Sequence, residues 1–152
     1  MNRISIDVRD IPEPAWLDRL EAFAQRALAM AGAEDWDLSL ALCGDGLIAS
    51  LNAEYRGKEG PTDVLSFEQG EWFDDPELGG RRFLAGDIVI SLEALRRNAE
   101  DFSVPEDEEL KRLVIHGILH LSGLDHEGTD PSEPMLAKQE DMLKRLAEER
   151  IL

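Results

Sequence analysis

The chain has 152 residues, 43% of them hydrophobic, and its 33 aspartates and glutamates outnumber 16 lysines and arginines, giving a net charge of −17. This composition excludes a disordered chain, and the length predicts a single domain spanning residues 1–152. The acidity argues against a broad nucleic-acid-binding surface, because cationic side chains dominate binding to phosphates.

The first half of the chain alternates between strand and helix patterns. In chain order, the apolar spacing predicts a strand at 4–8, a helix at 16–31, a strand at 38–42 and a short helix at 47–55. Pro12 and Pro14 lie where a helix can begin, and Gly32 ends the first helix. Asp45 is expected to cap the second helix. A loop rich in glycine and proline follows.

The second half predicts two further strands and three further helices. The expected elements are a strand at 64–67, a surface loop or hairpin at 68–82, a strand at 83–91, and helices at 92–101, 103–121 and 130–150. Ser91 can cap the first of these helices, and capping boxes at 103–106 and 130–133 open the other two. The whole pattern predicts an α+β fold: a single layered domain with an about four-stranded mixed sheet and about five helices.

Several features predict a cytoplasmic protein without a membrane partner. No apolar run approaches the roughly 20 residues that cross a bilayer. The N-terminal residues lack the continuous apolar segment of a secretory signal. The only cysteine, Cys43, lies in an apolar run and is expected to be a buried thiol that forms no intramolecular disulfide.

All three histidines lie within residues 116–126. His116 and His120 are four residues apart, so they share one face of a helix, roughly 6 Å apart along its axis. Gly123 can adopt a left-handed conformation that returns the chain, and His126 follows it. Three neutral nitrogens with one coordination position left open are typical of a catalytic zinc site. We therefore expect one Zn²⁺ per chain on a central helix, although nickel, copper and cobalt also suit three histidines.

The histidine spacing resembles the long zinc-protease motif H-E-x-x-H-x-x-G-x-x-H. Gly117 stands in the place of its glutamate, which is the general base for peptide hydrolysis. Because glycine cannot accept a proton, a peptidase mechanism of that type is disfavoured, whereas the metal-binding scaffold is retained.

The chain also resembles the YbeY family of bacterial endoribonucleases. The resemblance spans about residues 50–143. It is carried by H-G-x-L-H-L-x-G-x-D-H at 116–126, by the blocks 51–56, 61–67 and 86–91, and by Glu133, Met135 and Glu140 in the tail. Leu124 departs from the family, which often has tyrosine there, but this position is not one of the expected ligands.

The resemblance implies a single-strand-specific, metal-dependent endoribonuclease. It implies a role in ribosomal RNA maturation, notably at the 3′ end of small-subunit RNA, and in ribosome quality control. It implies zinc on the three histidines and a functional arginine at Arg56, whose planar guanidinium could meet the charge that develops on phosphate oxygens. The expected partners are single-stranded RNA and ribosomal proteins of the small subunit, and DNA is not expected.

Two other functions remain open from the residues. A zinc hydrolase of a small ester, amide or phosphate suits the acidic surface, and a non-enzymatic assembly factor with a structural zinc is the second alternative. Four acids could orient a histidine or act as a base, or could simply cap or face solvent: Asp63, Asp87, Asp125 and Glu127. Half of the cations could line one cleft or could be scattered: Arg56, Lys58, Arg81, Arg82, Arg96, Arg97, Lys111 and Arg112.

Overall fold

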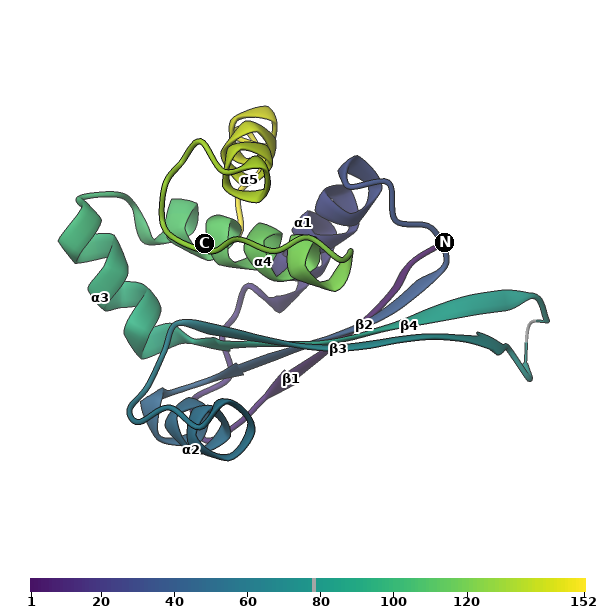
Figure 1. Cartoon of the computed structure of the whole chain (residues 1–152), viewed down its shortest axis with the longest axis horizontal. Helices are drawn as coiled ribbons and strands as arrows, with labels where there is room; N and C mark the ends of the chain where they lie inside the picture. Colours follow the sequence, from purple (N-terminus) through teal and green to yellow (C-terminus); the bar gives the residue numbers. More distant parts are fainter. Residues whose placement is uncertain (78) are drawn as a thin grey trace.

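The chain forms one four-stranded sheet with helices on both faces (Figure 1). This computed structural model describes residues 1–77 and 79–152. The elements are β1 (Arg3–Val8), α1 (Leu17–Met30), β2 (Trp36–Cys43), α2 (Asp45–Arg56), β3 (Val64–Asp74), β4 (Arg81–Ser91), α3 (Leu92–Phe102), α4 (Glu106–Leu121) and α5 (Pro134–Arg145). Every strand and helix predicted from the sequence is present, so the predicted α+β fold is confirmed.

The sheet is mixed, as predicted, with the strand order β1-β2-β4-β3. β1 pairs with β2 and β2 pairs with β4 in parallel, because α1 and then the segment containing α2 and β3 return the chain to the same edge. β3 pairs antiparallel with β4 as a hairpin. β3 is therefore an edge strand, and its Val64–Phe67 portion is available to line a site.

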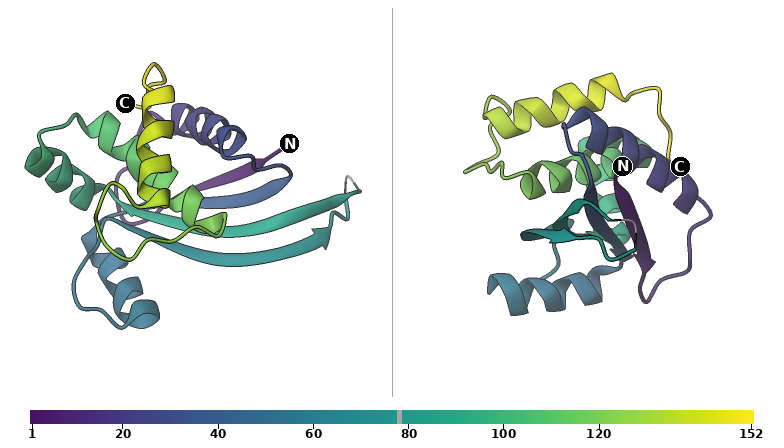
Figure 2. Two further views of the ribbon diagram at one scale, coloured as in Figure 1. Left: turned by 45° about the horizontal axis from the view of Figure 1, so that its top comes forward. Right: turned by 90° about the vertical axis from the view of Figure 1, so that its right-hand side faces the viewer.

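The helices form two layers on one face of the sheet and one on the other. α1 and α4 cover one face, α5 packs on the outer side of α4, and α2 covers the opposite face (Figures 1 and 2). Fully buried side chains from β4, such as Ile88 and Ile90, meet Ile115 and Ile118 of α4 in the main core. Cys43 is buried as predicted, and burial raises the pKa of its thiol to about 11.

Gly117 explains how closely α4 approaches the sheet. A Cβ atom at this position would lie 2.7 Å from Cδ1 and 2.8 Å from Cγ2 of Ile88. These distances are shorter than normal carbon contacts, so glycine is the residue that allows α4 to lie this close to β4. The structure therefore identifies Ile88 as the close neighbour that requires glycine at position 117.

The hairpin of β3 and β4 extends much further than the strand patterns predicted. Residues 68–74 continue β3, and Arg81 and Arg82 begin β4, in a region interpreted as a loop or hairpin. The ribbon is stabilised by an aromatic cluster in which Phe83 lies 5.0 Å from Trp72 and 5.5 Å from Trp36 between ring centroids. Backbone hydrogen bonds between paired strands form whether the side chains are polar or apolar. This acidic ribbon therefore lacks the alternation of apolar and polar residues from which a strand is predicted.

The predicted cap at Asp45 is wrong by one residue. Gly44 is the N-cap of α2, and Asp45 is the first helical residue. The Asp45 carboxylate instead accepts hydrogen bonds from Ser91 and Arg97, while its backbone N–H donates to Glu93 at 3.0 Å. A carboxylate from α3 therefore caps α2, which a local sequence pattern cannot reveal.

The two predicted capping boxes are also wrong, whereas the predicted cap at Ser91 is confirmed. Ser103 has a φ of 55° and ends α3 as its C-cap, so Pro105 precedes α4. Asp130 accepts hydrogen bonds from the backbone and hydroxyl of Ser132 in a turn, and Glu133 becomes the N-cap of α5. Serine and aspartate favour turns for the same reason that they favour caps, so the pattern was ambiguous.

The last helix ends at Arg145, earlier than the predicted Arg150. The buried ammonium of Lys111 on α4 donates to the carbonyls of Leu146, Ala147 and Glu149. These bonds satisfy carbonyls just after α5 that a continuing helix would pair internally. None of the helices in the described residues is both long and apolar enough to span a bilayer.

Candidate metal centre and its adjoining cavities

Three histidines converge at the C-terminal end of α4. His116 and His120 lie on one face of that helix with their Nε2 atoms 3.1 Å apart. His126 returns from the following loop, and one ligand atom from each ring lies within 4.8 Å of the others. The predicted convergence of His116, His120 and His126 is therefore present. We call these three residues the histidine group.

The proton of His116 is placed by Gln139 on α5. The Nδ1 atom of His116 lies 2.6 Å from Oε1 of Gln139. The amide orientation is fixed because its nitrogen donates to the Glu140 carboxylate, which can only accept. His116 therefore donates from Nδ1 and keeps a lone pair on Nε2, the atom that faces His120. Gln139 was not singled out from the sequence, because only the packing of α5 on α4 brings it to His116.

His126 is held by its own loop. Gly123 has the predicted left-handed conformation, with a φ of 98°. The Nδ1 atom of His126 donates to the Gly128 carbonyl at 2.7 Å, which again leaves Nε2 with a free lone pair. Asp125 accepts the His126 backbone N–H at 2.8 Å, and Glu133 accepts the N–H groups of residues 127 and 128. Acids of the motif and its tail thus shape the loop that carries the third ring.

The protonation states suit metal binding. Burial lowers the pKa of His116, and the charge of neighbouring His126 lowers it further. Burial and the two neighbouring imidazoles likewise lower the pKa of His120. Both rings are therefore neutral near pH 7, and a neutral imidazole is the form that binds a metal ion.

The residues present fit a metal ion. The Nε2 atoms of His116 and His120 lie 3.1 Å apart, so they either share a proton or direct two lone pairs at the same place, where a cation would relieve the repulsion between them. Within the described residues, the group contains three potential ligands and no fourth His, Cys, Asp or Glu. A three-nitrogen set of this kind leaves a coordination position open, which distinguishes catalytic from structural zinc sites.

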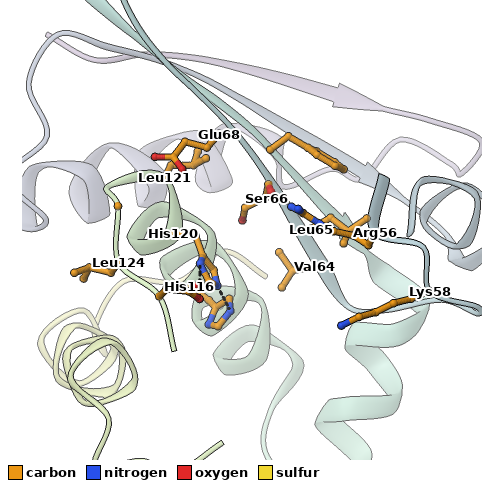
Figure 3. Close-up of a pocket in the computed structure, with 13 residues that line it drawn as sticks. Arg56, Lys58, Val64, Leu65, Ser66, Glu68, His116, His120, Leu121 and Leu124 are labelled. Carbon is orange, nitrogen blue, oxygen red and sulfur yellow. Dashed lines mark hydrogen bonds and ion pairs between the residues drawn. The ribbon is translucent and has the colours of Figure 1, made fainter. Parts of the chain in front are cut away.

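A cavity of about 710 Å³ opens beside His116 and His120. Arg56 and Lys58 line its opposite side, together with Val64–Glu68 of β3 (Figure 3). We call it the cation cavity. Arg56, the last residue of α2, donates a hydrogen bond to the Ser66 carbonyl, and its guanidinium lies 5.3 Å from the centre of the Phe67 ring.

The two cations of this cavity have no carboxylate partner among the described residues. Most of the other cations considered for a cleft form ion pairs outside this cavity. Arg82 pairs with Asp37, Arg97 with Asp45, Arg96 with Glu106, Lys111 with Asp107, and Arg112 with Glu108, Glu109 and Glu140, while Arg81 lies over the Trp72 ring. The eight residues therefore do not form one cleft, and only Arg56 and Lys58 line the cation cavity.

The structure shows where each of the four acids considered from the sequence lies and what it contacts. Asp63 accepts hydrogen bonds from Val64 N–H and from Asn98. Asp87 neighbours Ile88 in β4 and therefore faces the opposite side of the sheet, where it lines a groove beside α2. Asp125 and the Glu127 backbone belong to the loop that holds His126. These contacts support capping and loop-shaping roles for Asp63 and Asp125.

The fold and the site together define a class of protein: an α+β layered fold whose central helix carries a three-histidine candidate metal site open to a cavity. The family model described as endoribonuclease YbeY matches residues 5–147. The chain belongs to this family.

Individual relatives agree with this assignment. A protein of Treponema denticola named endoribonuclease YbeY is 51% identical over 145 residues, covering 93% of this chain and 92% of the relative. The protein of the same name from Aquifex aeolicus is 44% identical over 110 residues, covering 72% of this chain and 69% of the relative. A solution structure of a Thermotoga maritima protein is similar with a TM-score of 0.55 and 27% identity, covering 97% and 91% of the two chains.

Proposed function

We propose that this chain is a metal-dependent endoribonuclease acting in ribosomal RNA processing. The observation that carries the proposal is the cation cavity, where Arg56 and Lys58 face His116 and His120. Membership of a family named for endoribonuclease activity supports the same activity here. We further propose that residues 1–152 form one metallohydrolase domain, and that its substrate is single-stranded RNA at the 3′ end of small-subunit ribosomal RNA.

The proposed cofactor is one Zn²⁺ held by His116, His120 and His126. Three imidazole nitrogens and an open position match catalytic zinc better than the oxygen-rich sites of magnesium or calcium. When bound, zinc would supply Lewis acidity to the reacting phosphodiester.

The chain's own residues would orient the ligands and bind the substrate. Gln139 and the Gly128 carbonyl keep the protons of His116 and His126 on Nδ1, so both Nε2 atoms stay available. The Arg56 guanidinium would bind the phosphate oxygens with two parallel N–H groups, an interaction that strengthens as charge develops on them. Lys58 would add a second, more mobile positive charge.

The net charge of −17 bears on the partners. The cation cavity offers two cations without a carboxylate partner among the described residues, which gives limited attraction to a polyanion. We therefore propose that a small-subunit ribosomal protein supplies part of the affinity for the ribosome, and that DNA is not a substrate. Removing that protein from ribosomal particles should weaken binding. Unchanged binding to stripped particles would contradict the partner proposal alone.

The decisive experiment combines elemental analysis with cleavage of a single-stranded RNA. His120→Ala should lose both zinc and cleavage, whereas Arg56→Ala should keep zinc and lose about 10²- to 10³-fold in kcat/KM, the size expected for one oxyanion-stabilising donor. Arg96→Ala is the matched control, because Arg96 is an exposed arginine paired with Glu106 outside the cation cavity.

Two outcomes would favour the other functions. A zinc-loaded wild-type protein that hydrolyses small phosphates or esters but no RNA would indicate a small-molecule hydrolase. A folded His120→Ala protein that still supports ribosome maturation would indicate an assembly factor in which the metal is structural.

A further inference from the structure

A second cavity of about 610 Å³ also adjoins the histidine group. His116 and His126 line it, and His116 and Val64 are shared with the cation cavity. The histidine group therefore lies where the two cavities meet. An RNA strand whose reacting phosphate lies at this group must place its neighbouring nucleotides on either side of it, and the second cavity is one of these two sides.

The walls of the second cavity are suited to a flat apolar ligand. Phe102, at the end of α3, lines it with 63% of its surface exposed. Leu113 of α4, Leu136 of α5 and Pro131 of the connecting loop provide further apolar surface. An exposed aromatic ring at the edge of a cavity is the arrangement that proteins use to stack single-stranded bases.

The charges of the second cavity disfavour a phosphate, because its lining carboxylates outnumber its lining cations. Asp63, Glu109 and Glu140 line it, and its one lining cation within the described residues is Arg112. Arg112 is already bonded, with Nη1 at 2.8 Å from Glu109 and Nε at 3.0 Å from Glu140. Carboxylates repel phosphate but accept hydrogen bonds from the amino and imino groups of a base. The cavity therefore favours a nucleobase over backbone.

We propose that the second cavity binds the nucleobase adjacent to the cleaved phosphodiester, stacked on Phe102, while Arg56 and Lys58 bind the phosphate backbone in the cation cavity. This inference rests on the proposed RNA-cleaving function and adds to it a base-binding subsite. In this arrangement the anionic backbone of the RNA lies in the cation cavity on one side of the histidine group, and a neutral aromatic base lies in the second cavity on the other side.

The test is a cycle of protein and substrate changes measured by kcat/KM with the zinc-loaded protein. Phe102→Ala should lower kcat/KM for a single-stranded RNA by about 5- to 150-fold, the range expected for one lost base–aromatic stack. An RNA that lacks the base at one of the two nucleotides flanking the cleaved phosphodiester should lower kcat/KM of the wild-type protein by a similar factor. Combining the two changes should cost little more than either alone, because both remove the same contact.

Matched variants separate stacking from other causes. Phe102→Tyr keeps an aromatic ring and should retain most of the activity. Trp72→Ala removes another exposed aromatic ring, which lies on the hairpin away from both cavities, and should leave kcat/KM unchanged. Zinc content should be equal in all variants, so a loss of metal cannot explain the result.

Specific outcomes would overturn the inference. If wild type cleaves RNA but Phe102→Ala behaves like Trp72→Ala, or if the protein and abasic effects simply add at every position, the base subsite does not exist and the ribonuclease function stands. If zinc-loaded wild type cleaves no RNA, the proposed function fails and this inference fails with it.

Discussion

His116 connects the features of the site at the scale of single residues. It is a potential metal ligand, it lines both cavities, and its Nδ1 atom bonds to Gln139. Behind Gln139, Glu140 and Arg112 form a chain of charged hydrogen bonds that fixes the amide. The positions of the histidines could be predicted from spacing alone, but Gln139 could not, because it is 23 residues away from His116 in the chain.

Replacing Gln139 with leucine should weaken zinc binding by about 10- to 100-fold, the usual effect of losing a partner that orients a metal-bound histidine. The reason is that Nδ1 of His116 loses its acceptor, so the ring can rotate and the proton can move to Nε2. The measurement is the zinc Kd in competition with a chromogenic chelator. Lys138→Leu is the control, since Lys138 is the exposed neighbour on the same helix. Equal Kd values for the two variants would contradict this orienting role.

Gly117→Ala should destabilise the fold by about 1–3 kcal/mol, the cost of adding a methyl group to a packed core. The added Cβ would lie within 2.9 Å of three Ile88 side-chain atoms. The free energy of unfolding should be measured by urea titration. Ile88→Ala combined with Gly117→Ala should be more stable than the sum of the single effects, because it removes the clash. Simple additivity of the two substitutions would show that the contact with Ile88 is not the cause.

At the scale of elements, α4 is the helix around which the molecule is built. It packs on β4 through Gly117, carries two of the three histidines and supports α5 on its outer side. The spacing of its apolar residues predicted this helix from the sequence, and similar patterns predicted the central residues of all four strands. A hairpin was one of the two structures expected at 68–82, but the length of its strands and the caps at residues 45, 103 and 130 were not predicted, because cross-strand pairing and competing turns decide them. Local pattern determined element type, and tertiary contacts determined element ends.

Lys111 fixes the end of α5 against α4. Its ammonium is buried, lies 3.4 Å from Asp107 and donates to three carbonyls after α5. Lys111→Met should therefore cost about 3 kcal/mol or more, because the partly buried Asp107 carboxylate loses the opposite charge and the three carbonyls lose their shared donor. Lys144→Met, at an exposed site on α5, should change stability by less than about 0.5 kcal/mol. Equal unfolding midpoints in urea for both variants would refute this role.

The lowered pKa of Asp107 makes the stability of the same C-terminal region depend on pH. Burial alone would raise the pKa of Asp107, but hydrogen bonds from the Leu152 and Ile151 backbone and the charge of Lys111 outweigh it and lower the pKa. A carboxyl whose pKa is lower in the folded chain contributes stability that is present above its unfolded pKa, about 3.9. This contribution is lost as the pH falls through the folded value.

Asp107→Asn should therefore lose stability at pH 7 and should show a shallower loss than wild type as the pH falls below about 4. Urea unfolding at a series of pH values measures both effects. Asp141→Asn removes an exposed carboxylate on α5 and should follow the wild-type curve. An Asp107→Asn curve parallel to that of wild type would show that the pKa of Asp107 does not differ between the folded and unfolded chains.

Across the whole molecule, the distribution of charge reconciles an acidic protein with an RNA substrate. The excess of 33 acidic over 16 basic residues leaves the surface negative, yet Arg56 and Lys58 remain unpaired by carboxylates in the described structure, beside the histidine group. Such a net charge disfavours RNA binding in general, and the cation cavity provides local positive charge beside the histidine group. Weak non-specific binding and dependence on correct placement of the strand follow from this arrangement.

The salt dependence of RNA binding tests this view quantitatively. Each phosphate neutralised on a single strand contributes a slope of about −0.7 to log K against log salt, so two cations predict a slope of about −1.4 for the metal-free protein. Arg56→Ala should make the slope shallower by about 0.7, whereas Lys138→Ala, an exposed lysine on α5, should leave it unchanged. Fluorescence anisotropy of a short labelled RNA across a salt series provides the slopes. A wild-type slope steeper than about −4 would require many more phosphate contacts than the cation cavity offers, and would place the RNA on a different surface.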